Sequence, residues 1–310
     1  MRILISGGAG FIGANLSRKL LSLGNEVIVV DNLISGSREN IENLEENPLF
    51  TFYEIDINEK FDVGPADEIF HLASIASVYH YINNPIETLR VGSVGTYNLL
   101  EYARRYHSKL LFTSTSEVYG NPEVHPQKED YWGNVNPVGV RSCYDESKRF
   151  GEAMVMAFYR KYGVDTKIAR IFNTYGPYMK IDDRRVISNF IMQALQNKPL
   201  TIYGDGKQTR SFCYIDDTVD GLLKLMEANY HFPVNIGNSE EYTILNLAGK
   251  IIDLLGVEKK LVYKHALEDD PQRRRPDISL AIKLLNWQPQ ISLEKGLKRT
   301  IEWFRRKLQL

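Results

Sequence analysis

Residues 2–13, RILISGGAGFIG, decide the fold of this chain. The apolar run at 2–6 predicts a buried β-strand, and the residues from Phe11 onward predict an amphipathic helix. Glycines at positions 7, 10 and 13 allow a tight turn and let its backbone approach a pyrophosphate, whose charge meets the N–H groups at the helix N-terminus. Together the strand, turn and helix predict a dinucleotide-binding unit.

The end of the next predicted strand carries the acidic residue that such a unit needs. Asp31 follows Gly13 by 18 positions, close to the ~20 at which a carboxylate accepts the ribose hydroxyls. A carboxylate repels a 2′-phosphate and no arginine directly follows Asp31, so NAD is favoured over NADP. The alternative is a glycine-rich turn in which Asp31 only caps its strand.

Strand and helix patterns continue to alternate up to about residue 175. Such alternation is typical of βαβ units and a parallel sheet. The sequence therefore predicts an α/β fold with a Rossmann-type doubly wound parallel sheet. The predicted strands are Arg2–Ser6, Glu26–Asp31, Phe50–Glu54, Glu68–His71, Leu110–Ser114 and Lys167–Phe172, and the predicted helices include Phe11–Leu23, Pro85–Tyr106 and Tyr144–Tyr162.

After Gly176 the predicted elements become shorter. We expect an NAD-binding domain at 1–175 and a smaller C-terminal α/β substrate lobe at 176–310, with the chain free to cross between them near its end. The predicted elements of this lobe are helices at Ile187–Gln196, Asp216–Glu227 and Ile244–Leu255, strands at Leu200–Tyr203 and Phe212–Ile215, and a closing helix with Leu297, Ile301, Phe304 and Leu308 on one face.

Composition narrows the class of protein. The 310 residues are 43% hydrophobic and 25% charged, as in a globular protein, and the net charge of -1 provides no general attraction for nucleic acid. Cys143 and Cys213 match no zinc spacing, and the histidines form no ligand pair, so no metal site is expected. The sequence shows no apolar run long enough to cross a membrane and no signal peptide, which predicts a cytoplasmic protein.

A tyrosine and a lysine stand four residues apart at Tyr144 and Lys148, on one face of a predicted helix. A phenol is a weak base near neutrality, but a neighbouring ammonium and the positive ring of oxidised NAD favour its ionised form. Tyr144 can then take the proton of a sugar hydroxyl while hydride leaves the same carbon. This spacing is common by accident, but behind a glycine-rich nucleotide loop it predicts an active site.

Thr115 and Glu117 follow a predicted strand and complete this candidate site. Thr115 is placed to hydrogen-bond the reacting hydroxyl and the carbonyl that it becomes. Glu117 can orient a water or the sugar ring, or move a second proton. Both side chains could instead cap the loop that follows, and for Ser116 that interpretation is favoured.

The glycine spacing resembles that of the extended short-chain dehydrogenase/reductase family, and nearly the whole chain resembles the UDP-glucuronate decarboxylases within it. The resemblance is carried by "GGAGFIGANL", "TSTSEVYGNPEVHPQKEDYWGNVNPVGVRSCYDESKR", "ARIFNTYGP" and "DDPQRRRPDI". It implies that NAD oxidises C4 of UDP-glucuronate, that the resulting β-keto acid loses CO2, and that re-reduction gives UDP-xylose.

The resemblance also implies which residues bind the two ligands. Those for NAD are Gly7, Gly10, Phe11, Ile12, Gly13, Asp31, Asn32, Asp56, Ile57, Leu72 and Ser74, with Tyr144 and Lys148. Those for the nucleotide sugar are Tyr81, Arg90, Asn173, Arg185, Ser188, Asn189, Phe190, Tyr203, Arg210 and Arg274. Arginine forks suit both a diphosphate and a carboxylate, whereas Arg273 and Arg275 could be solvated surface residues.

Several residues depart from the family pattern around the sugar pocket. Gly92 replaces the usual asparagine, Arg90 stands where lysine is common, and Ile75, Val78 and Tyr79 lie where prolines are usual. These changes leave open another NAD-dependent nucleotide-sugar 4-epimerase or 4,6-dehydratase.

An alternative from another class is a non-catalytic dinucleotide sensor, against which the Tyr144/Lys148 pair argues. The family usually dimerises through helices near 90–106 and 144–162, so a homodimer is expected.

Overall fold

The computed structural model of the chain describes residues 1–266 and 270–309. At its centre is a seven-stranded parallel sheet with the order β3-β2-β1-β4-β5-β6-β11, which confirms the predicted Rossmann-type α/β fold. Its strands are β1 (Arg2–Ser6), β2 (Glu26–Asp31), β3 (Phe50–Glu54), β4 (Glu68–His71), β5 (Lys109–Thr115), β6 (Thr166–Ile171) and β11 (Pro233–Ile236).

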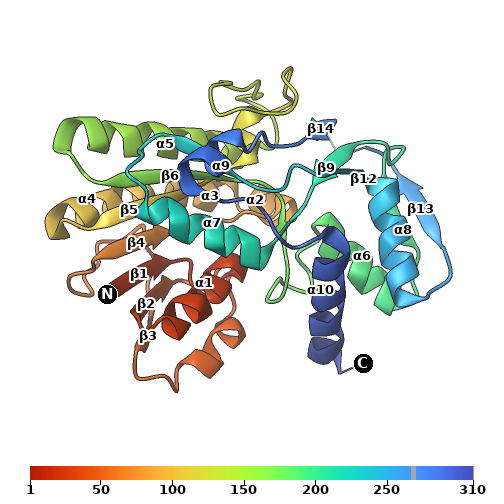
Figure 1. Cartoon of the computed structure of the whole chain (residues 1–310), viewed down its shortest axis with the longest axis horizontal. Coiled ribbons are helices and arrows are strands. Elements are labelled where there is room, and N and C mark those ends of the chain that lie inside the picture. The colour runs from red at the N-terminus through yellow and green to blue at the C-terminus, as the bar shows by residue number, and fades with distance from the viewer. Residues whose placement is uncertain (267–269, 310) are drawn as a thin grey trace.

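Helices cover both faces of this sheet, with α1 (Phe11–Ser22) and α7 (Ile215–Glu227) on one face and α4 (Thr96–Tyr106) and α5 (Ser142–Tyr162) on the other (Figure 1). Side chains of β1 alternate between the two resulting apolar clusters: Ile3 and Ile5 belong to the first, and Leu4 to the second. A strand covered on both faces needs a continuous apolar run, which explains why the period-2 polar alternation is missing from β1.

The smaller lobe lies at one end of the large sheet, where α6, α8 and α10 gather at the right of Figure 1. Three small sheets with the orders β12-β9-β14, β13-β8 and β10-β7 complete it. Its elements are β7 (Thr174–Tyr175), α6 (Val186–Leu195), β8 (Leu200–Tyr203), β9 (Thr209–Ser211), β10 (Cys213–Tyr214), β12 (Glu241–Thr243), α8 (Ile244–Leu255), β13 (Leu261–Lys264), β14 (Arg273–Arg274) and α10 (Leu293–Leu308).

The chain returns to the large lobe well before its C-terminal end, where the sequence predicts a crossing. After Ile215, helix α7 and strand β11 return to the large lobe, where β11 pairs in parallel with β6. Helix α9 (Ser279–Leu285) then packs on β11. Strand β11 covers the otherwise open edge of β6, but its four residues are too few to show a sequence pattern.

The helix predicted over Pro85–Tyr106 is divided into α3 (Pro85–Arg90), a π-helical turn over Val91–Gly95, and α4. Gly92 lies in this turn, where a β-carbon would come within 2.6 Å of Cβ of Ser147, so glycine allows the turn to pack directly on α5. Helix α2 (Val78–Asn83) was not predicted. Within 1–266 and 270–309, no helix is long and apolar enough to cross a membrane.

Candidate active site

Two cavities open where the strands of the large sheet end, which is where ligands bind in open α/β sheets. The glycine-loop cavity, lined by the 7–13 turn, has a volume of about 220 Å³. The tyrosine cavity, lined by Tyr144, has a volume of about 310 Å³. Leu72, Ser74 and Thr113 line both, so the two cavities adjoin.

The predicted NAD residues are brought together by the fold. Eleven of them line the glycine-loop cavity: Gly7, Gly10, Phe11, Ile12, Gly13, Asp31, Asn32, Asp56, Ile57, Leu72 and Ser74. The other two, Tyr144 and Lys148, line the tyrosine cavity next to the junction.

The glycine turn is a cradle that side chains would fill. Gly7 has a φ of +75°, and a β-carbon there would lie 2.6 Å from the backbone of Ala73, while one at Gly13 would lie 2.4 Å from the carbonyl oxygen of Gly7. Helix α1 begins directly after Gly10 with no side-chain cap, so the N–H groups of its first turn can meet a phosphate. These residues fit a dinucleotide pyrophosphate.

Asp31 ends strand β2 at the wall of the glycine-loop cavity. Its Oδ2 accepts the N–H of Ala9 at 3.0 Å and its Oδ1 accepts the N–H of Leu33 at 2.9 Å. Burial raises the pKa of Asp31, and these two hydrogen bonds act against the rise. The carboxylate is thereby held in place, and its remaining lone pairs can accept two further donors such as ribose hydroxyls.

Tyr144 and Lys148 lie one turn apart on α5, and both are buried. Nζ of Lys148 donates to the carbonyl oxygen of Thr113 at 2.8 Å and lies 6.0 Å from the centroid of the Tyr144 ring. Burial lowers the pKa of Lys148 to about 7 and raises that of Tyr144 to about 12. Burial dominates both shifts in the protein by itself, and the expectation that a neighbouring ammonium and the positive ring of oxidised NAD favour the ionised phenol stays a prediction.

The position of Thr115 is compatible with both predicted roles, a cap of the following turn and a hydrogen bond at the reacting oxygen. Its Oγ1 accepts the N–H of Glu117 at 3.3 Å and so caps the 3₁₀ turn Ser116–Tyr119. Hydrogen bonding between Thr115 and the Tyr144 side chain also opposes the rise in the pKa of the phenol that burial causes. The hydroxyl of Thr115 thus lies beside the dyad as well as at the start of the turn.

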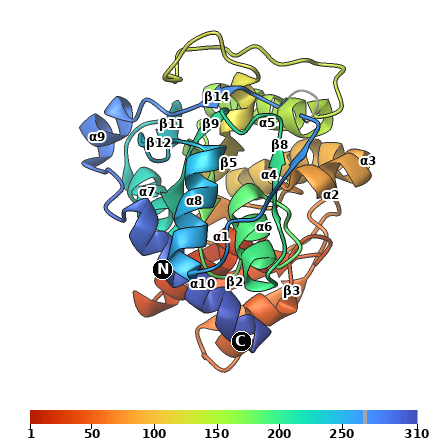
Figure 2. The same ribbon diagram turned by 90° about the vertical axis from the view of Figure 1, so that its right-hand side faces the viewer.

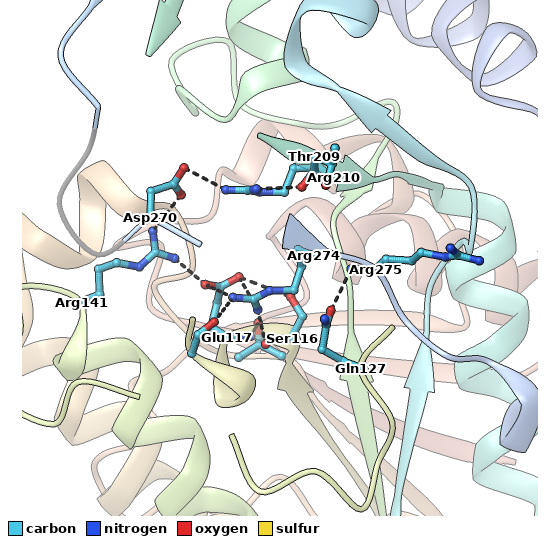
Figure 3. A network of polar contacts seen from close by, with 11 residues as sticks. Ser116, Glu117, Gln127, Arg141, Thr209, Arg210, Asp270, Arg274 and Arg275 are labelled. Atoms are coloured by element: carbon cyan, nitrogen blue, oxygen red, sulfur yellow. Dashed lines mark hydrogen bonds and ion pairs between the residues drawn. The ribbon is translucent and has the colours of Figure 1, made fainter. Parts of the chain in front are cut away.

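Glu117 lies among arginines from separate parts of the chain (Figure 3). Nη2 of Arg141 donates to Oε2 of Glu117 at 2.5 Å, and Nη1 of Arg274 lies 3.2 Å from Oε1. Burial acts to raise the pKa of Glu117, but Arg274, Arg141 and Arg210 together hold it well below its ordinary value. Glu117 is therefore ionised near neutral pH and has no proton to give.

Two members of this cluster were missed by the sequence analysis. Arg141 lines the tyrosine cavity, and Asp270 bridges Arg141 and Arg210 at 3.6 and 2.8 Å (Figure 3). Both residues lie inside segments that carry the family resemblance. Spacing along the chain gives no sign that these segments meet, so only the fold brings the two side chains to Glu117.

Seven of the ten residues predicted to bind the nucleotide sugar line the tyrosine cavity: Tyr81, Asn173, Arg185, Asn189, Phe190, Tyr203 and Arg210. The other three lie elsewhere. Ser188 is buried and donates to the carbonyl oxygen of Arg185, and Arg274 is buried behind Glu117. Arg90 lines the glycine-loop cavity instead, 3.8 Å from Glu59.

Most of the residues that depart from the family pattern lie at these cavities, whereas Gly92 lies in the π-helical turn against Ser147. Ile75 is buried in a small cluster with Tyr144, and Val78 and Tyr79 line the tyrosine cavity. Arg184 also lines this cavity, and its guanidinium lies 3.6 Å from the centroid of the Tyr79 ring. Among the residues that the structure describes, no group of histidine, cysteine and acidic side chains is placed to hold a metal ion.

A glycine cradle that leads into a cavity with a buried Tyr-Lys dyad defines a short-chain dehydrogenase/reductase. The family described as GDP-mannose 4,6 dehydratase matches residues 4–300. UDP-glucuronic acid decarboxylase 1 of Danio rerio is 50% identical over 308 residues, which cover 99% of this chain and 73% of that protein. The chain belongs to the extended short-chain dehydrogenase/reductase family, among relatives named UDP-glucuronic acid decarboxylase.

Solved structures of epimerases share the fold. UDP-glucose 4-epimerase of Thermotoga maritima with UDP-glucose has a TM-score of 0.92 and 34% identity, covering 99% of this chain and 100% of that one. UDP-glucuronic acid 4-epimerase from Bacillus cereus, in complex with UDP-glucuronic acid and NAD, has a TM-score of 0.89 and 30% identity, with coverage of 99% and 100%.

Proposed function

We propose that this protein is an NAD-dependent carboxy-lyase that converts UDP-glucuronate to UDP-xylose and CO2. The single observation that carries the proposal is that Glu117, paired with Arg141 and Arg274, lies in the same cavity as the Tyr144/Lys148 dyad. The 50% identity to a protein named UDP-glucuronic acid decarboxylase, against 34% and 30% to the two epimerases, supports decarboxylation over epimerisation.

The chemistry explains why a decarboxylase needs a dehydrogenase site. Direct loss of CO2 from C5 would leave an unstabilised carbanion, whereas a ketone at C4 makes the substrate a β-keto acid whose departing electrons enter the carbonyl. Bound NAD supplies this reversible oxidation at C4, and the positive charge of its oxidised ring favours the phenolate of Tyr144.

The dyad and its neighbours handle the oxygen at C4. Tyr144 takes the proton of the C4 hydroxyl and later returns it, and Thr115 donates to the same oxygen while it is a carbonyl or an enolate. Nζ of Lys148 is held by the carbonyl oxygen of Thr113, 6.0 Å from the centroid of the Tyr144 ring. All three residues line the tyrosine cavity, which supports these roles.

The tyrosine cavity binds the nucleotide sugar in this proposal. Arg185, Arg210 and Arg141 line it and supply guanidinium groups for a diphosphate and a sugar carboxylate. Arg185 is held by a two-point contact with Asp183 at 2.7 and 2.5 Å, which sets the direction of its remaining donors. The large lobe thus carries the redox centre, and the smaller lobe selects the substrate.

We also propose a homodimer in a reducing, cytoplasmic compartment. Exposed apolar side chains gather on α3, the π-helical turn, α4 and α5, and each of the three helices is in contact with that turn. They include Ile86, Leu89, Val94, Tyr97, Phe150 and Tyr162. Cys143 and Cys213 are free thiols, which supports a reducing location. Light scattering tests the dimer, and cell fractionation tests the compartment.

The experiment is incubation of the purified protein with UDP-glucuronate and NAD, followed by mass spectrometry of the nucleotide sugars. We expect a product lighter by one CO2, with UDP-glucose left unchanged in a parallel reaction. An active protein that leaves UDP-glucuronate untouched while converting UDP-glucose would contradict the proposal.

A further inference from the structure

A third cavity, of about 400 Å³, lies behind Glu117 and is separate in its lining from the glycine-loop cavity. We call it the rear cavity. The loop 120–141, which runs over the top of Figure 2 above β14 and α5, supplies about half of its lining residues. Its described lining is Glu117, Gly120, Asn121, Asn134, Val135, Asn136, Arg141, Asp145, Asp270, Pro271 and Gln272.

Most of this lining is polar, as a space for water requires. Glu117, Arg141, Asp270 and Pro271 line both the rear cavity and the tyrosine cavity, so these residues form the partition between the two. Three of its four residues are charged. A proton relayed by water between the rear cavity and the substrate would therefore meet mainly charged groups.

Asp145 is the titratable group on the far side of this partition. Its side chain is buried and lines the rear cavity but not the tyrosine cavity, and its Oδ1 has no hydrogen-bonding partner among the described residues. Burial, and next the charge of Glu117, raise the pKa of Asp145 to about 7. Two nearby carboxyl groups with pKa values pushed apart are the usual mark of an acid and its ionised neighbour.

Charged and titratable groups act on Asp145 from every side. Arg141 and Arg274 oppose the rise in its pKa, and Glu146 adds to it. The phenols of Tyr81 and Tyr144 are also within electrostatic reach. Both arginines are paired with Glu117, and their effect on Asp145 is smaller than that of burial.

The proposed decarboxylation consumes one proton, because a carboxylate leaves as neutral CO2 and a C–H bond replaces it. Glu117 is ionised and cannot supply this proton. Tyr144 holds the proton taken from the C4 hydroxyl and must return it there. The proton for C5 therefore has to come from another group or from water that reaches the site.

We propose that the rear cavity is the water-filled inlet for the proton that C5 takes up, and that Asp145 gives this proton through the cavity water. The bond between C5 and the carboxyl carbon breaks, and its electrons form the C4–C5 double bond of an enolate. Water then protonates C5 as Asp145 protonates that water, the C4 carbonyl re-forms, and solvent reprotonates Asp145. Asp145 does not touch C5; it acts through the water molecule that protonates C5. This inference rests on the proposed function.

The test variant is Asp145→Asn, which keeps the shape of the side chain but has no acidic proton. The first turnover should release CO2 at nearly the wild-type rate, whereas UDP-xylose should form about tenfold more slowly or worse. Because hydride cannot return until the carbonyl re-forms, reduced dinucleotide should accumulate on the protein, seen by its near-ultraviolet absorbance. The matched control is Glu146→Gln, a neighbouring carboxylate on α5 that pairs with Arg149 and lines none of the three cavities.

The pH dependence of the wild type gives a second readout, with Asp145→Asn as its control. The acid form of Asp145 is the donor, so the rate of UDP-xylose formation in the wild type should fall as pH rises through about 7, and Asp145→Asn should lack this fall. The inference is wrong if Asp145→Asn releases CO2 and forms UDP-xylose at the same rate. It is also wrong if the rate of UDP-xylose formation by the wild type does not change as pH rises through about 7. If the wild type releases no CO2 at all, the proposed function fails instead.

Discussion

The rings of Tyr81 and Tyr144 are parallel, with their planes 1° apart and their centroids separated by 5.1 Å. Tyr81 is 1% exposed, and its hydroxyl has no hydrogen-bonding partner among the residues that the structure describes. A buried hydroxyl without a partner is costly, so we expect this one to bind a ligand in the tyrosine cavity that Tyr81 lines. The stack also fixes the ring of Tyr144.

These two functions of Tyr81 can be separated by substitution. Tyr81→Phe keeps the stack and loses the hydroxyl, so KM for UDP-glucuronate should rise about tenfold with little change in kcat. Tyr81→Ala loses the stack as well and should lower kcat, because the phenol of Tyr144 is no longer held. Steady-state kinetics measure both, and equal effects of the two variants would refute the separation.

Tyr144→Phe should abolish the proton transfer at C4 and leave the fold intact. We expect turnover to fall by about 100-fold or more, with the amount of NAD that binds the protein unchanged. Product formation and NAD content are measured on the same preparation. Full activity in this variant would show that another group is the base.

Arg274→Ala should show whether Arg274 compensates the buried charge of Glu117 or is a surface residue without such a role. Arg274 is 1% exposed and also donates to the carbonyl oxygens of Ser116 and Gly120, so its loss leaves Glu117 poorly compensated and should cost about 3–5 kcal/mol of stability. Binding of UDP-glucuronate should weaken far more than binding of NAD. The exposed neighbour Arg273, changed to alanine, is the control, and similar unfolding curves for the two variants would count against this role.

Asp31→Ala should weaken NAD binding by about tenfold or more, because a charged acceptor for the ribose hydroxyls is lost. Asp31→Asn keeps an acceptor oxygen near Leu33 and Ala9 and should lose less. Calorimetric titration with NAD and NADP measures both. Unchanged NAD affinity in Asp31→Ala would remove Asp31 from the ribose site.

Glu117 should make the stability of the protein depend on acid pH. Its pKa in the folded protein is below its ordinary value of 4.5, so the folded state is favoured above that value and loses the benefit as pH falls through the folded pKa. The free energy of unfolding should therefore decline less steeply below about pH 4.5 in Glu117→Gln than in the wild type. Parallel declines in denaturant titrations would show that the arginines do not stabilise the carboxylate.

The parts of the fold that the sequence predicts are those formed by local pattern. The cradle at Gly7–Gly13 and the Asp31 strand end are each encoded within a few residues, and the structure places them as expected. Arg90 ends α3 and lines the glycine-loop cavity, and a helical pattern alone does not report which cavity a side chain at a helix end faces.

The rest of the site depends on contacts between distant segments. Strand β11 is too short to be recognised from its sequence, and its place beside β6 is known only from the fold. Asp270 and Arg141 are far apart along the chain, and only the fold brings their side chains together. The direction of the pKa shift at Tyr144 also depends on burial, which spacing on a helix does not report.

Loss of the carboxyl carbon from UDP-glucuronate tests the central claim most directly. The protein, NAD and UDP-glucuronate labelled with carbon-13 at the carboxyl group can be followed by NMR in real time. We predict that the carboxyl signal is replaced by labelled CO2 and bicarbonate as the proton signals of UDP-xylose appear. A carboxyl signal that persists while the C4 epimer of UDP-glucuronate forms would show that the protein is an epimerase and would contradict the account.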